Sequence, residues 1–437
     1  MIALLQYGGV GSLCLGALLA ARQRDAAAAR RTAIEAAALN ALLALGLLAA
    51  HLSGLLATAP GWPAVVPGMI GLVGLTAVAM TPARAARPQS MARILIVNAA
   101  SSALVGVSEP LVLAVLWAIP PIVAFVELSS RSETLRTARV FAVYMLPSVV
   151  LFAIGAVLLR QGETTAAMGP FLLALAIRQA LVPVHSWLPE LAERAPLGLV
   201  VAFVAPQLGV YLHLTCLAEQ ATQELSVAVA ALAATTAVFA AAMGIAQSRT
   251  RRALGYLIMS QSALVAFGLE PRSEVAHVGA LASWLVAGLS SAGLAMAVAA
   301  LEARRGVLSL QRPGGSFDRL PKLGTAFLVM GLASVGLPLT LGFVAEDLLF
   351  QGSMHDFPIL ALALVVATGL NGMTVARHFF LLFGGTSRHA GERDLTRRES
   401  AVLTVILLAL LAFGAWPAPV LSPLSPPASP PAHHSSR

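Results

Sequence analysis

Long apolar segments separated by short polar connections recur along the whole chain. A helix rises about 1.5 Å per residue, so about 20 apolar residues cross the roughly 30 Å of hydrocarbon in a bilayer. Strands of a membrane barrel are about half that length and alternate apolar with polar positions. The pattern therefore predicts an all-α integral membrane protein of about fourteen transmembrane helices, over residues 2–21, 32–57, 62–80, 93–108, 110–128, 139–159, 169–188, 197–217, 226–248, 253–269, 275–301, 322–350, 357–383 and 400–421.

Composition agrees with this prediction and limits the number of domains. Of the 437 residues, 58% are hydrophobic and only 11% are charged, so a soluble sphere of this size could not cover itself with polar side chains. No polar linker separates the helices, and we expect residues 1–421 to form a single polytopic membrane domain. The Pro- and Ser-rich segment 422–437 is expected to be a disordered tail.

The basic residues are concentrated in every second connection between the predicted helices. Of the 28 Lys and Arg residues, 23 fall on one side, which the positive-inside bias assigns to the cytoplasm. This placement explains the net charge of +8 without nucleic acid. It predicts a bacterial-type inner (plasma) membrane protein with both termini outside the cytoplasm.

The cysteines limit the redox chemistry of the chain. Cys14 and Cys216 both lie within predicted spans, which leaves no disulfide framework and no CxxC metal or cluster site. We therefore expect no cofactor and no metal, and we expect any redox centre to belong to a partner.

Proline and glycine residues interrupt three of the predicted helices. Proline removes a backbone donor and clashes with the preceding turn, so it predicts a kink or break whose freed carbonyls need partners inside the protein. Breaks in helices 169–188 and 322–350 would suit two inverted five-helix repeats, over about 93–217 and about 226–383. The residues concerned are Pro120, Pro121, Pro183, Pro189, Gly336, Pro338 and Gly342.

A specific motif lies in the segment from Ile177 to Pro196, which reads IRQALVPVHSWLPELAERAP. It resembles the signature of the antiporter-like membrane subunits of respiratory complex I and its relatives, the Mrp cation antiporters, membrane-bound hydrogenases and two-component inorganic-carbon uptake systems. The matching positions are Arg178, Pro183, His185, Trp187, Leu188, Pro189, Ala195 and Pro196. Three further segments keep the order of that family: Gln207 to Tyr211, Arg251 to Ser260, and Gly336 to Glu346. The resemblance covers roughly residues 90 to 385.

The resemblance implies a row of protonatable groups halfway across the membrane, and most of that row is missing here. The glutamate that the family has in its fifth helix falls on Val115 or Leu116. The pair of positions that hold histidine or lysine in the family's eleventh helix falls near Gly288 and Ala292, where only Ser290 and Ser291 are polar. The lysine that the family has in its seventh helix is replaced by Arg178, which cannot release a proton. The position of the lysine or histidine in the family's eighth helix is occupied by Gln207, and His213 lies about two turns further on. Glu346 remains, with Asp347 beside it, and the sole lysine of the chain is Lys322.

Each candidate residue of the ion pathway has a functional and a structural interpretation. We expect Arg178 to be buried near a helix break and to need a carboxylate partner. His185 suits a proton relay or a buried imidazole bonded to backbone freed by Pro189, and His213 suits a relay or a packed core residue. Glu346 is expected to face a water-filled cavity. The pair Arg251 and Arg252 favours positive-inside charge over a binding site.

Three functions remain open from the sequence. The first is an antiporter-like membrane subunit of a multi-subunit, complex-I-like assembly that contributes to proton or cation translocation or to its coupling. The second is a structural subunit that kept the fold and lost the proton path. The third is the membrane subunit of an inorganic-carbon uptake complex with a cytoplasmic zinc partner. In each case we expect a non-catalytic subunit, other membrane subunits as partners and possible contact with a peripheral redox or zinc protein.

Overall fold

The computed structural model describes residues 2–53, 62–82, 86–217, 222–311, 313–386 and 393–424. Within these ranges the chain is helical and contains no strand, which confirms the all-α prediction. Nine of the helices described there are long and apolar enough to cross a membrane. The total of fourteen crossings stays a prediction.

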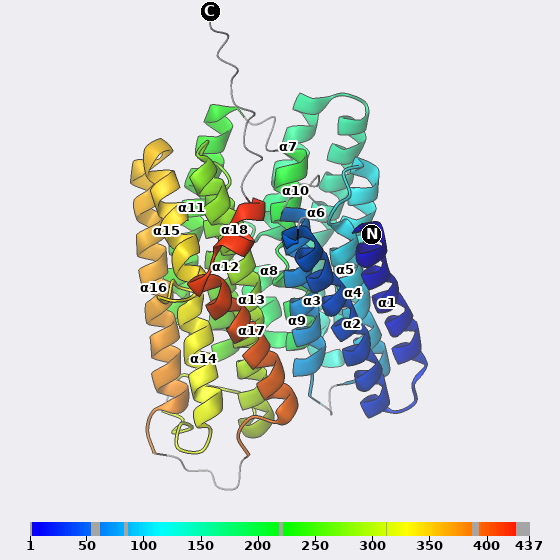
Figure 1. Cartoon of the computed structure of the whole chain (residues 1–437), viewed down its shortest axis with the longest axis vertical. Helices are drawn as coiled ribbons and strands as arrows, with labels where there is room; N and C mark the ends of the chain where they lie inside the picture. Colours follow the sequence, from blue (N-terminus) through cyan, green and yellow to red (C-terminus); the bar gives the residue numbers. More distant parts are fainter. Residues whose placement is uncertain are drawn as a thin grey trace, which may run out of the picture.

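The helices run roughly along one common direction, with α11 to α16 on the left and α1 to α6 on the right of Figure 1. In chain order they are α1 (Ile2–Arg22), α2 (Ala26–Leu52), α3 (Trp62–Met80), α4 (Pro88–Leu104), α5 (Pro110–Ser129), α6 (Leu135–Arg160), α7 (Thr164–Arg178), α8 (Trp187–Arg194), α9 (Leu197–Val204), α10 (Leu208–Cys216), α11 (Gln223–Ala246), α12 (Thr250–Gly268), α13 (Glu274–Arg305), α14 (Pro321–Ala333), α15 (Leu341–Asp356), α16 (Pro358–Phe383), α17 (Arg397–Ala415) and α18 (Ala418–Leu424).

The long helix α13 forms the centre of the bundle. It packs against α3, α12, α14 and α15, and its most apolar stretch is completely buried within the protein. A helix that is apolar on all sides must be surrounded by protein or lipid, and here the other helices surround it. The helices of both halves of the chain are therefore built around one common element.

Two of the three predicted interruptions are present. The segment predicted as one helix over 169–188 contains the end of α7 and the start of α8, separated by residues 179–186. The segment predicted over 322–350 is divided into α14 and α15, with Gly336 and Leu339 at φ values of +77° and +72° in the connection. The third interruption is absent, since α5 is continuous through Pro120 and Pro121. Proline removes only its own hydrogen bond, and the flanking apolar turns continue the helix.

One break is not among the predicted interruptions, and the predicted tail begins too early. The predicted helix 197–217 is divided into α9 and α10 around Pro206, where Gln207 adopts a φ of +44°. The predicted disordered tail is wrong for residues 422–424, because they belong to α18, whose apolar side chains Val420 and Leu424 are buried. Residues 425–437 lie outside the described part of the chain.

At each of the three breaks a side chain donates a hydrogen bond to a backbone carbonyl at the break. Trp187 Nε1 donates to the carbonyl of Ile177, and Trp284 Nε1 donates to that of Pro206, both at 2.9 Å. Gln261 Nε2 donates to the carbonyl of Ser334, also at 2.9 Å. Backbone groups freed in a bilayer have no water to bond, so these donors make the interrupted helices tolerable.

Ion pairs tie the helices together at the end of the bundle that carries the basic connections. The α1–α2 connection and the first turns of α14 and α17 all lie at the lower end of Figure 1. The paired residues are Glu127 with Arg93 and Arg131, Glu193 with Arg249 and Arg252, Glu302 with Arg251, and Glu399 with Arg304. Arg251 also donates to the carbonyl of Ala195 at 3.0 Å. Arg251 and Arg252 are thus anchored to neighbouring helices, in addition to contributing charge at this end.

Replacing Trp187 by Phe tests the role of these donors. The indole is buried, so Trp187→Phe keeps an aromatic ring and removes one of the two hydrogen bonds to the Ile177 carbonyl, while the bond from the backbone N–H of Ala180 remains. One intramolecular hydrogen bond contributes about 0.5 to 1.5 kcal/mol net, and we expect the free energy of unfolding to fall by that amount. The measurement is the thermal unfolding midpoint of the purified protein in detergent. Trp416→Phe is the matched control, because Trp416 is 70% exposed, and an equal loss in both variants would contradict the prediction.

Candidate functional site

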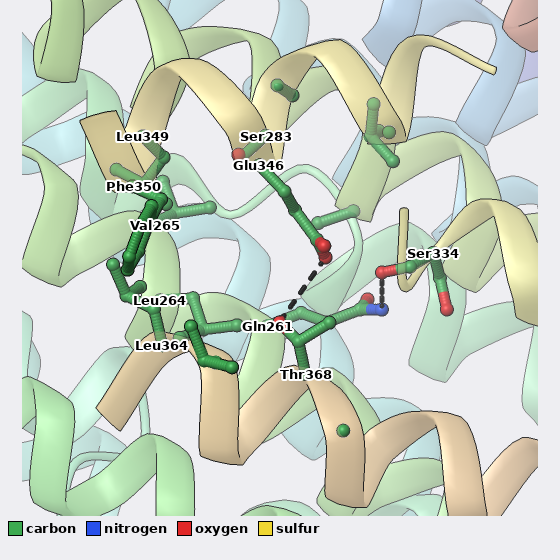
Figure 2. Close-up of a pocket in the computed structure, with 16 residues that line it drawn as sticks. Gln261, Leu264, Val265, Ser283, Ser334, Glu346, Leu349, Phe350, Leu364 and Thr368 are labelled. Carbon is green, nitrogen blue, oxygen red and sulfur yellow. Dashed lines mark hydrogen bonds between the residues drawn. The ribbon is translucent and has the colours of Figure 1, made fainter. Parts of the chain in front are cut away.

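A cavity of about 370 Å³ lies beside the break between α14 and α15. Its polar lining comes from α12, α13, α15 and α16 and from the end of α14: Gln261, Ser283, Ser334, Glu346 and Thr368. Figure 2 shows the Glu346 side chain extending from α15 toward Thr368, while the Gln261 amide reaches Ser334. The hydroxyl of Thr368 donates to Glu346 Oε1 at 3.5 Å. A cavity of this size, with several polar groups in a largely apolar lining, has room for several water molecules.

The break itself makes space for the Glu346 carboxyl group. A Cβ atom on Gly336 would lie 2.5 Å from Glu346 Oε2, and the φ of +77° at Gly336 also favours glycine. Pro338 follows in the same connection. At the start of α15, a Cβ atom on Gly342 would lie 2.1 Å from the carbonyl oxygen of Ala333. The two glycines therefore allow the ends of α14 and α15 and the carboxyl group to approach one another closely.

Glu346 is the only ionisable side chain among the residues that line this cavity. The rest of the lining is apolar or carries hydroxyl and amide groups, including Leu264, Val286 and Leu364. Serines of α13 connect to it, since Ser291 Oγ donates to Gln261 Oε1 at 3.4 Å. The arrangement can hold water around a single carboxyl group, which can bind a proton or a cation and release it again.

Asp347 lies on another face of α15 from Glu346. Its side chain is exposed, it accepts a hydrogen bond from Gln351 Nε2 at 2.8 Å, and it does not line the cavity. Successive residues on a helix are separated by about 100°, so Asp347 points in a direction about 100° away from that of Glu346. The structure separates the two acids that the sequence analysis treated as one site.

Arg178 ends α7 and is buried, with only 8% of its surface exposed. Its Cζ atom lies 4.7 Å from the ring centroid of Trp117 and 3.8 Å from that of Phe203. Among the described residues no carboxylate pairs with it, and Nη1 and Nη2 have no hydrogen-bond partner there. Within the described part of the chain the expected carboxylate partner is therefore absent, and the faces of two aromatic rings stabilise the guanidinium.

Gln207 lies beside Arg178 at the break between α9 and α10. Both residues line a small cavity of about 20 Å³ together with Trp187 and Ser262. The side-chain oxygen and nitrogen of Gln207 have no partner within the described part of the chain. The space is enough for about one water molecule, which could bond both side chains.

The two histidines of the predicted pathway lie in different parts of the fold. His185 belongs to the connection between α7 and α8, after the cis peptide bond of Val182 and Pro183, and its ring packs edge-on against Phe239 at a centroid distance of 5.1 Å. Its Nδ1 atom has no partner among the described residues. Pro189 lies in the first turn of α8. The packing against Phe239 suits a structural role for His185, and the Nδ1 atom suits a proton relay.

His213 lies on α10, and its Nε2 atom is 3.6 Å from Oε1 of Glu270. Glu270 is buried in the connection between α12 and α13, and this burial raises the pKa of its carboxyl group to about 8. The sequence analysis missed Glu270, since an acid just beyond a predicted helix end has the pattern of an exposed connection.

The helix 5 region also contains an acid that sequence reasoning did not identify. Of the two positions onto which the family's glutamate falls, Val115 is 61% exposed and Leu116 is partly buried against the core. Glu127, near the end of the same helix, is buried and accepts hydrogen bonds from Ser90, Arg93 and Arg131. A glutamate followed four residues later by Arg131 was the available signal in the sequence. Its partners make it part of the ion-pair network.

No group of residues suited to holding a metal is present in the described ranges. There, no three His, Cys, Asp or Glu side chains come together in a metal-binding arrangement. Cys14 is exposed on α1 and Cys216 is buried at the end of α10.

Comparison with known protein sequences finds similar membrane subunits of NADH-quinone oxidoreductases. NADH-quinone oxidoreductase subunit M of Rickettsia prowazekii (strain Madrid E) is 26% identical over 258 residues, which are 57% of this chain and 52% of the relative. The chain thus spans about half the length of the curated relatives it matches.

Two solved structures show the same fold over almost the whole chain. A chain of respiratory complex I from Thermus thermophilus with bound NADH has a TM-score of 0.86 and 23% identity, over 97% of this chain and 98% of that one. A chain of the Mrp complex from Dietzia sp. DQ12-45-1b has a TM-score of 0.84 and 16% identity, over 97% and 96% of the two chains.

The family model described as "NADH:quinone oxidoreductase/Mrp antiporter, TM" matches residues 135–371. This range contains both the α7–α8 and the α14–α15 breaks, together with Glu346 and Arg178. The resemblance predicted from the motifs is confirmed, and the chain is an integral membrane protein that belongs to the NADH:quinone oxidoreductase/Mrp antiporter transmembrane family.

Proposed function

We propose that this chain is an antiporter-like membrane subunit of a multi-subunit, complex-I-like assembly, in which it contributes to proton or cation translocation or to its coupling. The observation that carries the proposal is the Glu346 carboxyl group beside a cavity of about 370 Å³ at a helix break. An ionisable group inside a membrane is costly and is retained mainly where water, a partner charge or function offsets that cost. Here Thr368 donates a hydrogen bond to the carboxyl group, and the cavity has room for water.

The proposed path uses the half of the chain that contains α11 to α16. In that half Glu346, Gln261, Ser334 and Thr368 surround one cavity. In the other half Arg178 retains its charge at all accessible pH values, because a guanidinium group does not release its proton in proteins. Its charge would repel a passing cation, so we assign translocation to Glu346 and a supporting electrostatic role to Arg178, Gln207 and His185.

One observation favours a second function, that of a structural subunit without translocation. Arg178 is held between Trp117 and Phe203 and has no carboxylate partner in the described part of the chain, so the charge pair expected of a proton path is absent. Such a subunit would keep the fold in order to hold its neighbours together. The two functions differ in whether Glu346 must ionise.

Replacing Glu346 by Gln separates the two functions. Glutamine keeps the size and the hydrogen-bonding capacity of the side chain and removes its ionisation. We expect Glu346→Gln to reduce ion translocation by at least about tenfold, equivalent to about 1.4 kcal/mol, with assembly intact. The measurement is dye-reported proton uptake into inverted membrane vesicles that contain the whole assembly, driven by its natural electron donor or ion gradient.

The matched control for this experiment is Glu274→Gln. Glu274 is an exposed acid in the first turn of α13, outside the cavity. Full translocation by Glu346→Gln vesicles that contain normal amounts of the assembly would support the structural function. Equal loss in both variants would show that the assay responds to charge removal in general.

A second prediction concerns the partners. We expect the tagged chain, extracted from its own membrane in mild detergent, to be recovered with at least one other integral membrane subunit identified by mass spectrometry. A cluster-bearing oxidoreductase would favour coupling to electron transfer, and a zinc protein would favour inorganic-carbon uptake. Recovery of the chain alone, in an active state, would contradict the proposal. We place the assembly in the inner (plasma) membrane, with the arginine-rich end of the bundle in the cytoplasm and both termini outside.

A further inference from the structure

One face of α15 is exposed and combines apolar side chains with a carboxylate. Phe343, Asp347, Gln351 and Met354 follow one another at intervals of four, four and three residues, which places them on one stripe of the helix. Phe343 is 50% exposed and Met354 is 38% exposed, and Asp347 and Gln351 are also exposed. The opposite face of α15, with Ala345 and Leu349, is buried against α13. We refer to Phe343, Asp347, Gln351 and Met354 as the outer stripe of α15.

Asp347 lies at a depth where lipid alone cannot solvate it. Helices α14 and α15 form one interrupted crossing, and a break of this kind lies near the bilayer midplane. Asp347 follows Leu341, the first residue of α15, by six positions, which is about 9 Å along the helix. Half of the hydrocarbon thickness is about 15 Å, so the carboxylate falls within the apolar layer.

Nothing in the described part of the chain neutralises this carboxylate. Its hydrogen bond comes from the uncharged amide of Gln351 on the same stripe, and it takes part in no ion pair among the described residues. Charged side chains at this depth normally face a protein interior or a water-filled cavity, and Asp347 does neither within this chain. An exposed acid in hydrocarbon therefore indicates a surface that another protein covers.

Charge complementarity identifies the kind of partner. The covering segment must bring a positive side chain, Lys or Arg, to the apolar layer beside Asp347. A second copy of this chain is poorly suited, because its one lysine, Lys322, begins α14 at the far end of the crossing. Its arginine inside the membrane, Arg178, is buried between aromatic rings.

We propose that the outer stripe of α15 is the docking surface for a transmembrane helix of a different subunit, which carries a Lys or Arg side chain that pairs with Asp347. The inference depends on the proposed function only in requiring that the chain belongs to an assembly. It assigns to Asp347 a role in assembly that is distinct from the role of Glu346 in translocation.

Photo-crosslinking on the wild-type background tests the surface without disturbing the ion pair. A benzophenone amino acid replaces Phe343, the tagged chain is expressed in its own membrane, and the crosslinked peptide is identified by mass spectrometry. We expect a crosslink to a transmembrane segment of another subunit that contains Lys or Arg. The control position is Val143, which is 69% exposed on α6 in the other half of the bundle. A crosslink to lipid only, or equal yields of the same subunit from both positions, would overturn the inference.

A charge test follows in the same membranes. Asp347→Leu should lower recovery of the crosslinked subunit by at least about tenfold, equivalent to about 1.4 kcal/mol, and Glu346→Gln should leave recovery unchanged. Exchanging the charges, with Asp347→Arg in this chain and an acid in place of the partner's basic residue, should restore recovery. If the wild-type chain retains its subunits and Asp347→Leu retains them equally, the inference fails and the proposed function stands. If the wild-type chain retains no subunit, both fail together.

Discussion

The need to satisfy backbone groups inside a membrane determines how this protein is built. Three crossings are interrupted, and each break frees carbonyl groups in a region without bulk water. Trp187, Trp284 and Gln261 donate hydrogen bonds into these breaks. Two of the donors, Gln261 and Trp284, come from α12 and α13, the most deeply enclosed helices of the bundle. The central helices are therefore both the packing core and the means by which the breaks are tolerated.

The same requirement links the fold to the candidate site. Gln261 bonds the freed carbonyl of Ser334 and also lines the cavity that contains Glu346. The glycines at the α14–α15 break leave space that the carboxyl group occupies. The residues that bond or surround the backbone at this break thus also position the Glu346 carboxyl group. A substitution at the break therefore affects both.

The two halves of the chain differ in the surroundings of their buried ionisable side chains. In one half Glu346 lies beside a cavity of about 370 Å³, which has room for water. In the other half Arg178 lies between two aromatic rings beside a space of about 20 Å³. A carboxyl group near water can change its protonation, whereas an enclosed guanidinium group is a fixed charge. This asymmetry supports translocation through one half and an electrostatic role for the other.

The sequence by itself determined the membrane location, the family and the breaks at Gly336 and in the segment after Arg178, because length, hydropathy and local motifs carry that information. The tertiary structure alone decided which prolines interrupt a helix, since Pro120 remains inside α5 whereas Pro206 separates α9 from α10. It also supplied the aromatic partners of Arg178 and turned Glu346 and Asp347 to different surfaces. Helix rotation and contacts between distant segments arise from packing, and no local pattern along the chain encodes them.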